Sequence, residues 1–166
     1  EKGRGENVYT RVKKHLNQKP ETADKGYENK LSKTYDIIDE SLLTFVENNQ
    51  DVSFHIVFPP YSRFLYALWK KKNPKKYLLY QKTVEYLVQE STKYKNMNIY
   101  VLDDLEYLSD LNNYRDMRHY NTEMNSLMID YIVQKKHVKS MKELDAVMKK
   151  ADKMNSEYNL SKELDY

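Results

Sequence analysis

Glycine is confined to the start of this chain. The 166 residues include three glycines, Gly3, Gly5 and Gly26, and the 140 positions after Gly26 have none. Phosphate-binding loops, dinucleotide-binding turns and the sharp turn that presents a nucleophilic serine all need glycine directly after a strand. The sequence therefore argues strongly against a complete nucleotide-binding or α/β-hydrolase site of the usual form.

Length and composition favour one globular domain. A chain of 166 residues can bury roughly 70% of its unfolded surface, and this one is 40% hydrophobic and 32% charged. The 28 basic and 25 acidic residues are interspersed and leave a net charge of +3, so no nucleic-acid partner is expected. Cysteine is absent, which excludes thiolate chemistry. The histidines lack metal-ligand spacing, so neither a metal nor a cofactor is expected.

The distribution of polar residues divides the chain into three parts. Residues 1–33 are polar, charged and interrupted by glycine and Pro20, and they are predicted to form a flexible arm with a short helix near residues 8–16. Residues 34–157 contain the periodic apolar segments of an α/β domain. Residues 158–166 are predicted to be a frayed tail.

Hydrophobic periodicity predicts alternating helices and strands in the central part. The helices are expected at residues 35–49, 76–95, 121–134 and 140–156, and the strands at 51–58 and 98–102. This order predicts parallel strands joined by right-handed crossovers. The expected fold class is α/β, a partial three-layer sandwich with a small parallel sheet flanked by helices, as in flavodoxin-like folds. An exposed edge of that sheet could pair with a second copy and form a homodimer.

Two polar segments are expected at the same edge of this sheet. In parallel sheets, functional groups gather in the loops beyond the carboxyl ends of the strands. The segment Pro59–Ser62 follows the first strand, and a loop with Asp116 and His119 follows the second. Histidine suits general-base chemistry near neutral pH, and a carboxylate three residues earlier can fix its tautomer. The alternative is an acid favoured by the dipole of the following helix, beside a surface histidine.

The order of these segments resembles the C-terminal half of the SGNH (GDSL-type) hydrolases. The resemblance rests on the strand ending in Phe58-Pro59-Pro60-Tyr61-Ser62, the next strand Ile99-Tyr100-Val101-Leu102, and the segment Tyr114-Arg115-Asp116-Met117-Arg118-His119-Tyr120 before a helix. It covers roughly residues 35 to 135 and is greatest for the branch that handles acyl groups on cell-surface polysaccharides and teichoic acids. It implies that Asp116 is the orienting acid and His119 the base. Four residues of the two loops are expected to contact the substrate: Tyr61, Ser62, Tyr114 and Arg118.

The chain departs from that family at the nucleophile. The family's serine lies in a Gly-Asp-Ser block, and its oxyanion hole adds a glycine and an asparagine from further blocks; none of these is found here. The resemblance thus implies the C-terminal portion of a longer esterase or acyltransferase, inactive alone because an acid and a base cannot form an acyl-enzyme. The implied partners are an acylated polysaccharide or glycopolymer and the upstream half of the same protein, and the implied location is the cell envelope.

Three other possibilities are open from the residues. Ser62 could replace the missing nucleophile, although it lacks small neighbours for an oxyanion and suits a helix cap. The basic run from Trp69 to Tyr77 could contact an anionic glycan, a nucleic acid or a membrane, or could be a solvated loop that leads into a helix. The whole chain could also be a non-catalytic binding or assembly module in which the Asp-x-x-His loop is structural.

Overall fold

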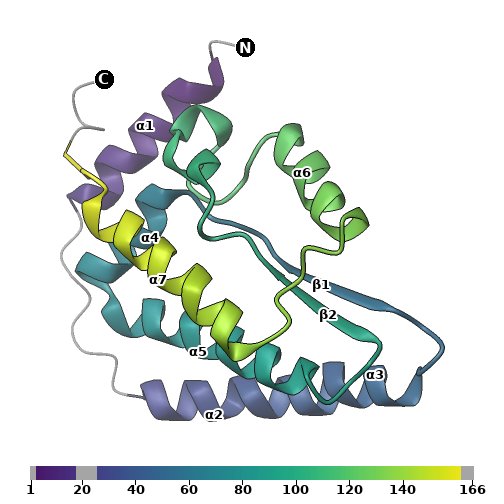
Figure 1. Cartoon of the computed structure of the whole chain (residues 1–166). Helices are drawn as coiled ribbons and strands as arrows, with labels where there is room; N and C mark the ends of the chain where they lie inside the picture. Colours follow the sequence, from purple (N-terminus) through teal and green to yellow (C-terminus); the bar gives the residue numbers. More distant parts are fainter. Residues whose placement is uncertain (1–2, 18–25, 162–166) are drawn as a thin grey trace.

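The computed structural model describes residues 3–17 and 26–161. In this part of the chain, helices surround two strands (Figure 1). The mixed α/β class that the sequence predicts is confirmed. The elements in chain order are α1 (Gly3–Leu16), α2 (Tyr27–Ile37), the π-helix η1 (Ile38–Leu43), α3 (Thr44–Asn48), β1 (Phe54–Phe58), α4 (Arg63–Lys72), α5 (Pro74–Ser91), β2 (Met97–Val101), the 3-10 helices η2 (Glu106–Ser109) and η3 (Leu111–Asn113), α6 (Thr122–Val133) and α7 (Met141–Glu157).

The sheet consists of β1 and β2, which pair in parallel from Phe54 opposite Met97 to Phe58 opposite Val101. The connection between them runs through α4 and α5, because parallel neighbours need a crossover. On the other side of β2, the amide of Val138 donates to the carbonyl of Ile99 at 2.9 Å. Parallel pairing therefore sends both chain exits, after β1 and after β2, to the same edge of the sheet.

Each face of the sheet packs on a different group of buried residues, because successive side chains of a strand point to opposite faces. Ile99 of β2 packs with Val84 and Val88 of α5 and Val46 of α3. Tyr100, the next residue of β2, belongs to the second group, which surrounds α4. The sheet is thus covered on both sides, as a small parallel sheet requires.

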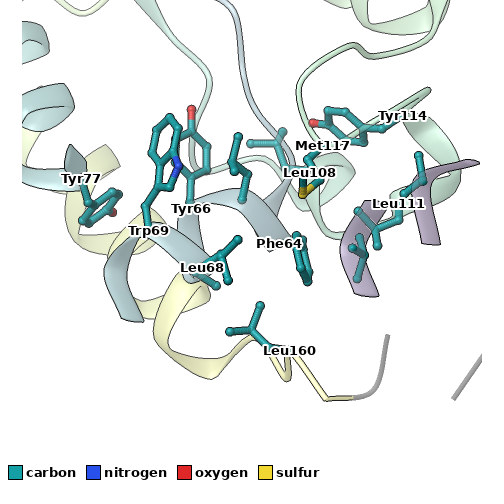
Figure 2. Packing of buried hydrophobic residues seen from close by; sticks show 14 of the residues in the cluster. Phe64, Tyr66, Leu68, Trp69, Tyr77, Leu108, Leu111, Tyr114, Met117 and Leu160 are labelled. Atoms are coloured by element: carbon teal, nitrogen blue, oxygen red, sulfur yellow. The ribbon is translucent and has the colours of Figure 1, made fainter. Parts of the chain in front are cut away.

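Helix α4 lies at the centre of the second group (Figure 2). All residues from Arg63 to Trp69 are buried, so the helix is enclosed on every side rather than along one stripe. Around it lie residues from α1, α5, the loop after β2 and the segment after α7; those labelled in Figure 2 are Tyr77, Leu108, Leu111, Tyr114, Met117 and Leu160. The loop that follows β2 is therefore held against α4 by apolar contacts.

A buried polar network fixes the start of the same loop. Asp103, directly after β2, accepts hydrogen bonds from the hydroxyls of Tyr66 at 2.8 Å and Tyr80 at 2.7 Å. Burial raises the pKa of this carboxyl group. The guanidinium of Arg63 donates to the carbonyl of Leu105 at 2.9 Å and to the side chain of Asn155 at 2.9 Å. Buried polar groups with partners of this kind favour one arrangement of the chain.

The N-terminal segment is more structured than its composition predicts. The helix expected near residues 8–16 is present as α1, and Val8 and Val12 on it are fully buried against the group around α4. Helix α2 begins at Tyr27, inside the stretch predicted as a flexible arm over residues 1–33. Two valines four residues apart lie on one face of the helix and pack it on the core. The charged composition of the segment does not indicate this packing. Residues 18–25 of the predicted arm lie outside the described part.

Part of the predicted tail packs on the core. In the segment expected to be frayed, residues 158–166, Leu160 is 8% exposed and packs on α4, while residues 162–166 lie outside the described part.

None of the helices in the described ranges is long and apolar enough to cross a bilayer.

The packing of α1 predicts the effect of truncating one of its valines. Val12→Ala should lower the free energy of unfolding by about 2 kcal/mol, because it leaves a cavity at a fully buried site. Chemical denaturation of the two proteins measures the difference. Lys14→Ala, an exposed position on the same helix, should change the stability by less than about 0.5 kcal/mol. Equal stabilities for all three proteins would show that α1 does not pack in the core.

Candidate acid–base site

The loops that follow β1 and β2 are joined by hydrogen bonds. The backbone amide of Ser62 donates to the carbonyl of Met117 at 3.1 Å, and the Ser62 hydroxyl donates to the same carbonyl at 2.9 Å. The buried hydroxyl of Tyr114 donates to the carbonyl of Pro60 at 3.3 Å. These contacts bring the two segments together at one edge of the sheet, as the parallel topology predicts.

The Asp116–His119 pair lies at the tip of a narrow turn. Tyr114 and Tyr120 form an antiparallel bridge at its base, and the amide of Arg115 donates to the carbonyl of His119 at 2.7 Å. Because Tyr114 is 1% exposed, the Tyr114 end of the turn is anchored in the core. The turn then leads into α6, whose N-cap is Asn121.

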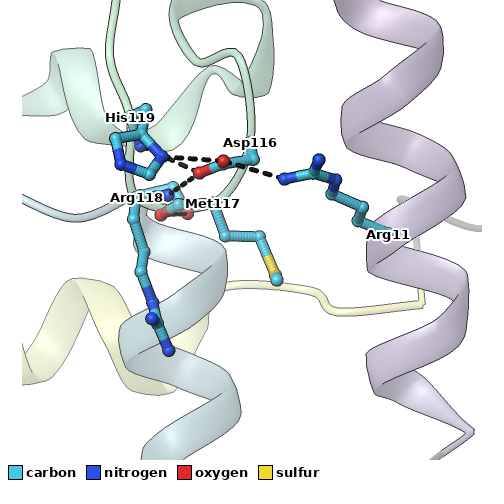
Figure 3. A network of polar contacts seen from close by, with 6 residues as sticks. Arg11, Asp116, Met117, Arg118 and His119 are labelled. Carbon is cyan, nitrogen blue, oxygen red and sulfur yellow. Dashed lines mark hydrogen bonds and ion pairs between the residues drawn. The ribbon is translucent and has the colours of Figure 1, made fainter.

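The carboxylate of Asp116 accepts hydrogen bonds from four donors (Figure 3). One oxygen, Oδ1, accepts from the backbone amides of Arg118 at 2.8 Å and His119 at 3.0 Å. The other, Oδ2, accepts from Nδ1 of His119 at 2.7 Å and from Nη1 of Arg11 at 2.9 Å. The amide contacts close the turn, the imidazole contact orients His119, and the guanidinium contact ties the turn to α1.

The electrostatics of this group determine the tautomer of the histidine. Partial burial by itself raises the pKa of Asp116, but the hydrogen bonds from His119 and from the two amides outweigh it and lower the pKa to about 2. The carboxylate is therefore ionised near neutral pH and can only accept hydrogen bonds. Nδ1 of His119 must then hold a proton, which leaves Nε2 as the nitrogen that can take up another.

His119 is accessible to a reactant. Its side chain is 74% exposed, while that of Asp116 is 13% exposed. Both residues line a cleft of about 490 Å³ together with Met117 and Arg118 from the same turn. A carboxylate that is shielded and an imidazole that is open to the cleft are the arrangement that a general base requires.

The other predicted site residues are placed differently. Ser62 is fully buried, and its hydroxyl also accepts from the amide of Leu65, so that it caps α4. Tyr61 packs edge-on against Trp69 with ring centroids 5.5 Å apart, and Tyr114 is buried. Of the four expected substrate contacts, Arg118 lines the cleft, whereas Tyr61, Ser62 and Tyr114 are not among its lining residues. The helix-cap interpretation of Ser62 agrees with its geometry.

Residues from other elements complete the cleft, and few of them could be predicted from local sequence patterns. They are Arg11 and His15 of α1, Leu65, Leu68, Trp69 and Lys72 of α4, and Asn73 and Lys76 at the start of α5. The basic run that begins at Trp69 pointed to the members from α4 and α5. The two residues of α1 had no signal apart from the Val8–Val12 spacing, which identifies the buried face of that helix.

The cleft itself does not supply the hydroxyl or thiol nucleophile of an esterase. Among the described residues that line it, none carries a hydroxyl or thiol group. In the described ranges there is also no group of three histidine, cysteine, aspartate or glutamate side chains placed to hold a metal ion. The lining residues can support proton transfer at His119 and the binding of charged groups.

No protein-family model, curated protein or solved structure matches this chain. Its function is therefore inferred from the geometry of the Asp116–His119 turn and the cleft beside it.

The lowered pKa of Asp116 predicts a pH-dependent contribution to stability. Because the pKa is about 2 in the folded chain against an ordinary value of 3.8, ionised Asp116 should stabilise the fold by about 2 kcal/mol above pH 4. This contribution should be lost as the pH falls from about 4 to about 2. The measurement is the difference in unfolding free energy between wild type and Asp116→Asn at a series of pH values. A difference that stays constant over this interval would contradict the assignment.

Proposed function

We propose that this chain supplies the acid and the base of an SGNH-type esterase or O-acyltransferase. Its substrate would be an O-acyl group on a cell-envelope polysaccharide, and its site of action the cell envelope. The observation that carries the proposal is the 2.7 Å hydrogen bond between Nδ1 of His119 and Asp116. The other ring nitrogen, Nε2, can then accept a proton from a reactant in the open cleft. The resemblance of the two loops to the family's C-terminal blocks supports the same assignment.

The proposed reaction needs a serine from the upstream half of the same protein. Nε2 of His119 takes the serine proton as the serine oxygen attacks the ester carbonyl. Asp116 stabilises the imidazolium that forms. The imidazolium then returns the proton to the departing alkoxide of the sugar, which leaves an acyl-enzyme. A water molecule or a second hydroxyl group, deprotonated by Nε2 of His119, then attacks the acyl carbonyl. The bond to the serine oxygen breaks, the imidazolium returns the proton to that oxygen, and the acyl group leaves as the free acid or the new ester.

The free edge of the sheet offers a place for that upstream half. Among the described residues no strand pairs with the outer side of β1, and the edge amides and carbonyls of such a strand can accept another. Phe45 of α3 packs edge-on against Phe54 at the start of β1 and is 57% exposed. Further parallel strands along β1, with their helices, would cover this surface and complete a three-layer sandwich. A second copy of the chain is the other possible occupant of the edge.

One observation favours the alternative, a non-catalytic binding or assembly module. Asp116 is also bound by Arg11, so the turn connects α1 to the rest of the fold. A carboxylate with that structural role would be needed even without catalysis. The two functions differ in what they require of His119, whose exposed ring contributes little to packing.

The test is a loss of activity in the protein that contains the upstream half. The proposal expects a Gly-Asp-Ser block in the reading frame ahead of Glu1. For that protein, His119→Ala should lower kcat/KM for deacetylation of an O-acetylated polysaccharide by about 10⁴-fold, because the base is lost. The 166-residue chain alone should not form an acyl-enzyme with p-nitrophenyl acetate.

His55→Ala is the matched control, because His55 is an exposed histidine on β1 that does not line the cleft. Its activity should equal that of wild type. A reading frame without a Gly-Asp-Ser block, or a His119→Ala protein as active as the His55→Ala protein, would overturn the proposal and favour the binding module.

A further inference from the structure

The cleft beside His119 has a strongly cationic lining. Among its described lining residues are four lysines and arginines against one carboxylate, that of Asp116. The chain as a whole is nearly balanced, with 28 basic and 25 acidic residues, so this excess is local. A concentration of one sign of charge in a concave site raises the local concentration of ligands of the opposite charge.

The cations converge on the cleft from separate elements. Arg11 reaches it from α1, Arg118 from the turn, and Lys72 and Lys76 from the junction of α4 and α5. Nζ of Lys72 donates to the carbonyl of His15 at 3.3 Å, and it also contacts the carbonyl of Leu16. These contacts with the end of α1 keep the charge of Lys72 at a fixed place.

The position of Lys76 adds to the attraction for an anion, whereas the helix ends at the cleft do not. Nζ of Lys76 lies 4.8 Å from the centre of the Trp69 ring, which positions its charge over the indole at the cleft. Asn73, another lining residue, is the N-cap of the 18-residue helix α5. Asn73 is also the C-cap of α4, so the positive end of the α5 dipole and the negative end of the α4 dipole meet there and offset each other.

Arg118 is the residue best placed to bind a ligand directly. Its side chain is exposed, and within the described part of the chain its guanidinium has no hydrogen-bond or ion-pair partner. In Figure 3 it extends from the turn, away from the Asp116–His119 pair. A guanidinium can hold a phosphate or carboxylate through two parallel hydrogen bonds.

We infer that this cleft binds a phosphate or carboxylate group of an anionic glycan and so holds the acylated sugar beside His119. The inference deepens the proposed function and rests on it for the role of the glycan as substrate. A volume of about 490 Å³ lies in the range of pockets that enclose a small molecule or a short segment of a polymer. Single-stranded nucleic acid instead needs a charged groove that follows its backbone, and a membrane surface needs a broad exposed face.

The only tryptophan of the chain provides the readout, because Trp69 lines the cleft. Poly(glycerol phosphate) and polygalacturonate serve as the phosphate and carboxylate probes, with dextran as the neutral glycan. At least one anionic polymer should change the Trp69 fluorescence in a saturable way, and salt should weaken the binding. The polymer that binds more tightly identifies the anionic group.

Arg118→Ala should raise the Kd for that polymer by about 10-fold, whereas Arg118→Lys should have a smaller effect. Arg115→Ala is the matched control, because Arg115 is an exposed arginine of the same turn that does not line the cleft. It should change the Kd by less than about twofold. Equal weakening by Arg118→Ala and Arg115→Ala would overturn the inference. So would anionic polymers that bind no better than dextran, or tighter binding to single-stranded DNA or to vesicles of phosphatidylglycerol.

Binding by this chain requires no turnover, so the two proposals can fail separately. Binding that depends on Arg118, in a protein whose activity does not depend on His119, would remove the esterase and the substrate role of the glycan with it. Activity that depends on His119 without selective binding of anionic polymers would leave the esterase and overturn the anionic substrate.

Discussion

The site depends on the hydrogen bonds and the ion pair that the ionised carboxylate of Asp116 accepts. Two backbone amides, one imidazole nitrogen and one guanidinium donate to its two oxygens. A carboxylate with this many donors is stabilised in its charged form, and the four contacts fix three things together. They set the shape of the turn, orient His119 and connect the turn to α1. Helix α1 is held in the core by Val8 and Val12, and its residues Arg11 and His15 form one wall of the cationic cleft.

The rest of the fold supports that carboxylate through a few buried contacts. Parallel pairing of β1 and β2 places their following loops at one edge, and Ser62 joins those loops through the carbonyl of Met117. Asp103 and its two tyrosine partners hold the start of the second loop on α4. Because α4 is buried along most of its length, its residues can serve the core on one side and the cleft at its end. Residues with structural roles thus surround the pair for which we propose a chemical role.

Periodicity predicted most of the elements, although not α4, and it could not predict the direction of loop side chains. The strands and the helices α5, α6 and α7 were expected within a few residues of their observed bounds, because each has a clear apolar stripe. Tyr61, Ser62 and Tyr114 were expected to contact a substrate from their position in the loops, yet Ser62 and Tyr114 point into the protein. Their hydroxyl groups satisfy backbone carbonyls, and such pairings depend on tertiary contacts that a local pattern does not contain.

The contribution of α1 could not be predicted for a related reason. Arg11 and Asp116 are 105 residues apart in the chain, and no local feature of either residue indicates the other. The glycines, Pro20 and many charges around α1 favoured a flexible arm, whereas the decisive feature was the spacing of two valines. The Asp-x-x-His spacing, by contrast, is a local pattern. Its two side chains meet because the backbone amides of Arg118 and His119 donate to Asp116 and close the turn.

The tautomer of His119 tests the central claim most directly. In protein labelled with ¹⁵N at histidine, long-range ¹H–¹⁵N spectra distinguish a proton on Nδ1 from one on Nε2 in the neutral ring. The account predicts that neutral His119 holds its proton on Nδ1, where Asp116 accepts it, and that Asp116→Ala releases the ring to favour the Nε2 form. A neutral His119 with its proton on Nε2 in the wild-type chain would show that Asp116 does not orient the base.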